Sequence, residues 1–71
     1  MSNKENGVTI QLEAKVYRLL EEEGKKDGLT ITQEISLATL HFFKKHEPKL
    51  FEEFKRKVDP AVLRVFERET A

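Results

Sequence analysis

A five-residue stretch near the start of the chain constrains the fold more than any other feature. In Val8-Thr9-Ile10-Gln11-Leu12, apolar and polar residues alternate strictly. This pattern predicts a half-buried β-strand with Val8, Ile10 and Leu12 facing inward and the other two residues facing outward. No other stretch of the sequence has a strand pattern. We therefore expect its backbone groups to pair with the same strand of a second copy, which predicts a homodimer.

The length and composition also favour a dimer. A chain of 71 residues forms one small domain, and such domains often need disulfides, a metal or a second chain for stability. The sequence has no cysteine, and its two histidines make a poor metal site. Thirteen basic and thirteen acidic side chains give zero net charge, which lowers the expectation of nucleic-acid binding unless a local basic patch exists.

Helical periodicity follows the strand pattern. From about Glu13 to Lys26, the apolar residues Val16, Leu19 and Leu20 fall on one helix face, and Gly28 supplies a left-handed residue that ends the helix. Thr30 with Gln33 forms a capping-box pattern for a second helix, which should end before Pro48. Several apolar positions in this second helix suggest burial on more than one side, as in a central dimer helix.

The last third of the chain has helical patterns of its own. Lys49 to Lys57 has helical spacing, and Asp59-Pro60 is a favourable N-cap for a further short helix. We expect these helices to pack back onto the dimer and enlarge its core, or alternatively to bind a protein partner. The predicted organisation is a flexible arm at 1–6, a main domain at 7–47 and a helical extension at 48–71.

The order strand, helix, glycine turn, helix resembles the ribbon-helix-helix family of Arc/MetJ/CopG-like repressors and antitoxins. The similarity rests on the alternating residues 8–12, on Asp27-Gly28-Leu29-Thr30-Ile31-Thr32-Gln33-Glu34-Ile35, and on Ala38 and Phe42 three and seven residues later. The resemblance implies a mainly α fold with one N-terminal strand, in which two strands pair as an intermolecular antiparallel ribbon, with extra C-terminal helices. It also implies a cytoplasmic transcriptional repressor that reads the major groove of double-stranded DNA with that ribbon.

Each residue role comes from the same resemblance. The implied base-reading residues are Gly7, Thr9 and Gln11. The implied phosphate contacts come from basic side chains and from the start of the second helix, where free amides favour an anion: Lys4, Lys15, Arg18, Thr30, Ile31 and Thr32. The expected dimer core combines the strand and both helices: Val8, Ile10, Leu12, Leu19, Leu20, Ile35, Ala38 and Phe42.

The residues favour neither catalysis nor a cofactor. No nucleophile with an adjacent base and no phosphate-binding glycine loop occurs, so we expect no enzyme activity, no cofactor and no metal. No apolar run suits a membrane span, and the polar start of the chain does not resemble a signal sequence, so we expect an intracellular protein. The alternative function is a protein-interaction module, or an antitoxin-like partner binder, that keeps the dimer and binds DNA weakly or not at all.

Overall fold

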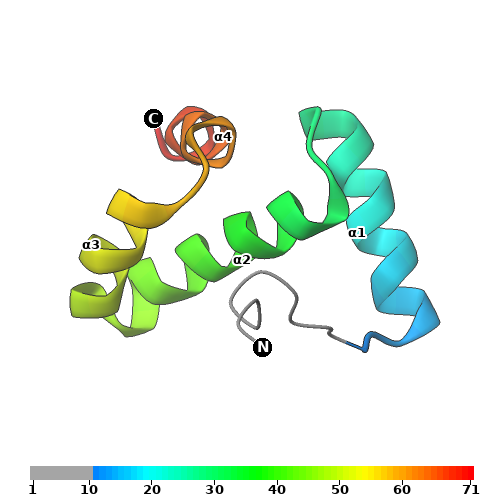
Figure 1. The fold of residues 1–71 in the computed structure, drawn as a ribbon, viewed down its shortest axis with the longest axis horizontal. Helices are drawn as coiled ribbons and strands as arrows, with labels where there is room; N and C mark the ends of the chain where they lie inside the picture. Colours follow the sequence, from blue (N-terminus) through cyan, green and yellow to red (C-terminus); the bar gives the residue numbers. More distant parts are fainter. Residues whose placement is uncertain (1–10) are drawn as a thin grey trace, which may run out of the picture.

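The computed structural model describes residues 11–71, which form four α-helices (Figure 1). The helices are α1 (Ala14–Asp27), α2 (Ile31–His46), α3 (Pro48–Lys57) and α4 (Pro60–Thr70). Short turns join them, so helix follows helix along nearly the whole described chain. This part of the molecule is therefore a small all-α fold.

The predicted ribbon-helix-helix fold is wrong. Residues 11–71 contain no strand, and Gln11 and Leu12, which end the predicted strand, have no regular secondary structure. Val8, Thr9 and Ile10 lie outside the described residues. The physical reason is that a strand needs hydrogen bonds from a neighbouring strand, and alternation along one short segment does not provide them. The four helices satisfy their backbone groups internally and need no such neighbour.

The turn between α1 and α2 has the predicted chemistry. Gly28 adopts a left-handed conformation with φ of 74°, and the amide of Leu29 donates to the carbonyl of Gly24 at 2.8 Å. Thr30 then caps α2. Its hydroxyl accepts from the Gln33 amide at 3.1 Å, and the Gln33 side chain accepts from the Thr30 amide at 2.9 Å. The predicted left-handed glycine and capping box are both confirmed.

Prolines separate the last three helices. Pro48 occupies the first turn of α3, and α2 ends just before it, with the Glu47 amide donating to the Phe43 carbonyl at 2.8 Å. Asp59 caps α4 by accepting from the Ala61 amide at 2.8 Å, and Pro60 follows as the first helical residue. The predicted N-cap at Asp59 is confirmed.

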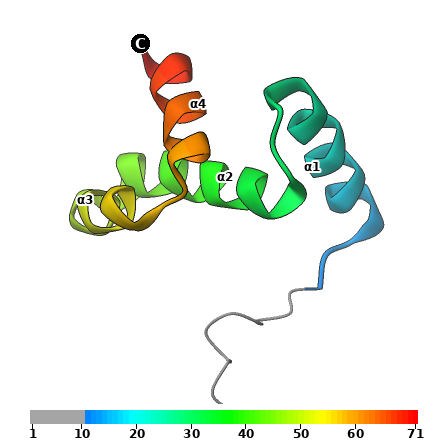
Figure 2. The ribbon, with the colours of Figure 1, turned by 45° about the horizontal axis from the view of Figure 1, so that its top comes forward.

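Helix α2 is the central element, because each of the other helices contacts it. Figures 1 and 2 show α1 and α3 at opposite ends of α2, with α4 crossing over its middle. The core lies between α2 and α4, and Phe51, Phe54 and Val58 pack against its edge. Its buried apolar side chains are Leu29, Leu37, Leu40, Val62, Val65 and Phe66.

Candidate interaction surface

Helix α2 has two apolar sides, and the described chain covers only one of them fully. Leu37 and Leu40 are buried against α4, with exposed fractions of 4% and 0%. Residues at spacings of four, three and four, starting from Ile31, lie on the opposite side of the helix. Along this side burial decreases until Phe42 is 56% exposed. We call this side the outer stripe of α2, and it comprises Ile31, Ile35, Ala38 and Phe42.

Helix α1 also leaves apolar side chains in solvent. Its buried residue is Gly24, near the C-terminal end, where α1 meets α2. Toward the N-terminal end, Leu19 is 62% exposed, and Val16 and Tyr17 are exposed as well. Leu12, just before the helix, is similarly exposed. Several large apolar side chains close together on one short helix are unusual for a surface that faces only water.

The predicted dimer-core residues coincide with these uncovered positions. Leu19, Ala38 and Phe42 are exposed, and Leu20 and Ile35 are only partly buried. Val8 and Ile10 lie outside the described residues. None of the described members of that set belongs to the buried core of the chain. The structure therefore places the predicted dimer residues on helix surfaces, separate from the core that α2 builds with α4.

The implied DNA-contacting residues do not form one described site. Gly7, Thr9 and Lys4 lie outside the described residues, and Gln11 is exposed in the segment before α1. Lys15 and Arg18 are exposed on α1. Thr30 precedes α2, where both its hydroxyl and its amide take part in the capping box. The first-turn residues of α2 complete the set: Ile31 and Thr32.

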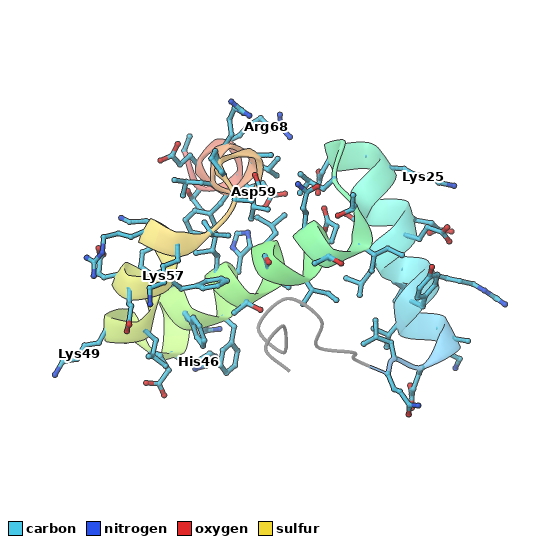
Figure 3. All side chains as sticks on the ribbon, viewed as in Figure 1. Lys25, His46, Lys49, Lys57, Asp59 and Arg68 are labelled. Carbon is cyan, nitrogen blue, oxygen red and sulfur yellow. The ribbon has the colours of Figure 1, made fainter. Side chains whose placement is uncertain are left out.

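Three of the basic residues near the junction of α2 and α3 have contacts with other side chains of the chain. The Lys44 ammonium lies 5.6 Å from the centre of the Phe66 ring, and Lys55 lies 5.2 Å from that of Phe51. Lys57 is within 3.3 Å of a Glu53 carboxylate oxygen. Lys49 instead points away from α3 into solvent (Figure 3). The Glu53 carboxylate offsets the charge of Lys57, whereas the ring contacts leave the charges of Lys44 and Lys55 in place.

Sequence reasoning missed one residue with unusual chemistry, Glu34. It is only 6% exposed, and its Oε2 has no hydrogen-bond partner within the part of the chain that the structure describes. Burial, followed by the neighbouring Asp27 carboxyl, raises the pKa of Glu34 from 4.5 to about 7. Glu34 lies three and six residues before Leu37 and Leu40, so its position near the buried side follows only once these two leucines are known to be buried.

Residues 11–71 present neither a membrane span nor a metal site. No helix among them is long and apolar enough to cross a lipid bilayer. Within the same range, no three histidine, aspartate or glutamate side chains are arranged to hold a metal ion. Comparisons of the chain with protein-family models, with curated proteins and with solved structures find no match.

Proposed function

We propose that this chain is a self-associating protein-interaction module. In this proposal a second copy covers the outer stripe of α2 together with the exposed apolar side chains of α1. One observation carries it: residues 11–71 build their core from one side of α2 and leave a second apolar side, including Phe42 and the nearby Ala38, exposed. Water-facing apolar surface of this kind is stabilised when a partner removes it from solvent.

The order of residues along the outer stripe suits contact with the same stripe of a second copy. Two identical helices that cross antiparallel present the same surface to each other, so each contact occurs twice. With the small Ala38 near the crossing, the backbones can approach closely, and the large Phe42 can pack against the partner's Ile31 at each end. Zero net charge means that two copies meet without overall repulsion.

Burial of the exposed apolar side chains by a second copy would contribute favourable free energy to association. Complete burial of a Leu or Phe side chain contributes about 1.5–3 kcal/mol, so side chains that are about half exposed, such as Leu19 and Phe42, would contribute about 1 kcal/mol each. Symmetry doubles each contribution. A small chain with no cysteine for a disulfide, whose described residues bury six apolar side chains, benefits most from such association.

Sedimentation equilibrium at micromolar concentration tests the proposal. We expect a dimer for the wild type, a monomer for Phe42→Glu, and a dimer for Leu50→Glu, a matched control because Leu50 is a similarly exposed apolar residue on α3. Circular dichroism checks that both variants keep their helices. A wild-type chain that sediments as a folded monomer at every concentration would contradict the proposal.

Sequence-specific DNA binding stays a prediction from the family resemblance. The ribbon that was expected to read the bases is not among the described elements, and three basic side chains near α3, those of Lys44, Lys55 and Lys57, contact rings or a carboxylate of the same chain. Fluorescence polarisation with random duplex DNA at low salt distinguishes the two functions, because a module that acts through protein contacts alone is expected to bind it weakly. The cytoplasmic location likewise stays a prediction.

A further inference from the structure

The contact between α1 and α2 is centred on a buried carboxyl group. Glu34 on α2 is almost fully buried, and α1 approaches it through Gly24. A Cβ atom added at Gly24 would lie 2.5 Å from the Leu29 carbonyl oxygen and 3.4 Å from Cγ of Glu34. The Leu29 carbonyl leaves room only for glycine at this position, and the Glu34 side chain lies in contact distance of the same point of α1. A change in the charge of Glu34 therefore acts directly on the contact between α1 and α2.

Acidic side chains lie near Glu34 both on the α1 side and on the α4 side. Helix α1 contributes Asp27 and Glu23, and α4 contributes Glu69. Two cationic side chains are close to these groups, but each contacts a neighbour of Glu34: Lys26 lies 3.2 Å from Glu23, and His41, which is charged only when protonated, lies 2.8 Å from Glu69. A negative charge on Glu34 would thus be desolvated and would face three other carboxyl groups.

No binding partner within the described chain relieves that charge. Oε2 of Glu34 accepts no hydrogen bond from residues 11–71, and those residues include no carboxylate group arranged for a metal ion. A neutral, protonated Glu34 fits the site, because its proton can be donated to the Asp27 carboxylate. An ionised Glu34 needs hydration. Either water enters the contact between α1 and α2, or the two helices separate.

We propose that Glu34 is a proton-operated latch that seats α1 against α2 when protonated and releases the α1 contact when it ionises. Of the two helices next to Glu34, α1 is held less firmly, because its buried residue is Gly24. Helix α4 is held to α2 by the core, through Val62 and Phe66. The pKa of Glu34, raised to about 7, places the change near neutral pH. The latch does not depend on the proposed self-association.

Amide hydrogen exchange of the full chain, followed by NMR and corrected for the intrinsic pH dependence of exchange, tests the latch. Between about pH 5.5 and about pH 8.5 we expect protection of the α1 amides to fall at least about tenfold relative to the α4 amides. In Glu34→Gln, whose neutral amide imitates the protonated acid, protection should remain high at both pH values. This variant keeps His41 and His46, so any change that persists belongs to the histidines.

Two further measurements keep the test decisive. Carboxyl ¹³C shifts of the wild type report the titration of Glu34 directly, even if the Gln variant fails to fold, and a midpoint at an ordinary glutamate value would overturn the latch. The same exchange experiment in the Phe42→Glu background separates the latch from self-association. An equal loss of α1 protection in Glu34→Gln, or no loss in the wild type, also overturns it.

Discussion

Gln33 joins the start of α2 to the start of α4. Its Nε2 donates a hydrogen bond to Asp59 Oδ2 at 3.0 Å, while its Oε1 accepts from the Thr30 amide at 2.9 Å. The other carboxylate oxygen of Asp59 accepts from the Ala61 amide. One side chain thus completes the cap of its own helix and orients the residue that caps another helix 26 positions later in the chain.

Gln33→Ala should destabilise the chain by more than an ordinary surface substitution. It removes half of the capping box and the bond to Asp59, for which we expect a loss of about 1–2 kcal/mol in the free energy of unfolding. Urea denaturation measures the loss, and Gln11→Ala, outside the helices, is the control with little effect. Asp59→Ala should cost less in the Gln33→Ala background than in the wild type, since the bond is already absent. Additive effects would contradict the proposed coupling.

The protonation of Asp59 should weaken the fold in acid. The Ala61 amide, then Gln33 and Arg64, hold the pKa of Asp59 below its usual 3.8. A carboxyl whose pKa is lower in the folded chain contributes stability that is present above the unfolded pKa and is lost as pH falls through the folded pKa. Urea denaturation below about pH 4 should therefore show a steeper loss for the wild type than for Asp59→Asn. Identical acid profiles would remove Asp59 from this role.

Glu34 should have the opposite effect on stability. Its pKa is raised on folding from 4.5 to about 7, so the folded chain holds this proton more tightly than the unfolded chain does. Stability from this group is fully present below pH 4.5 and falls as pH rises to about 7. The difference between these two pKa values corresponds to at most about 3 kcal/mol in the free energy of unfolding. In Glu34→Gln the decline across this range should be absent in urea denaturation, and a wild type whose stability is flat there would contradict the raised pKa.

The helices could be predicted from the sequence because their ends are set by local chemistry. Gly28, Thr30 with Gln33, and Asp59 followed by Pro60 each act within a few residues, and each does in the structure what the pattern predicted. The strand was predicted wrongly because its stability would depend on a neighbour that no local pattern can supply.

Which side of α2 faces the core could not be predicted from α2 alone. Ile35 and Phe42 have the same helical spacing as a core stripe, yet Leu37 and Leu40 are the buried residues. The choice depends on where α4 brings Val62 and Phe66, which is a contact between distant parts of the chain. Glu34 was missed for the same reason, because its burial comes from α1 and α4 rather than from its own helix.

Gly24→Ala should distort the turn that joins α1 to α2. An added Cβ would lie 2.5 Å from the Leu29 carbonyl oxygen, a backbone atom that cannot move away easily. Alanine favours helix by about 1 kcal/mol over glycine, so a net loss of stability means that the clash outweighs this gain. We expect a net loss of about 1–3 kcal/mol in urea denaturation. Gly28→Asn is the control, because open space surrounds Gly28 and asparagine tolerates its positive φ.

Truncation of leucines distinguishes the core from the proposed interaction surface. Leu40 is fully buried, so Leu40→Ala should lower the free energy of unfolding by about 2–5 kcal/mol at any protein concentration. Leu19 is 62% exposed in the single chain, so Leu19→Ala should have little effect in dilute solution. If a second copy covers Leu19, the cost of that substitution must grow as concentration rises, because association then stabilises only the wild type. Thermal denaturation across a range of concentrations measures both. If the effect of Leu19→Ala stays small at high concentration, α1 lies outside the proposed interface. The outer stripe of α2 would then be the only part of that interface left.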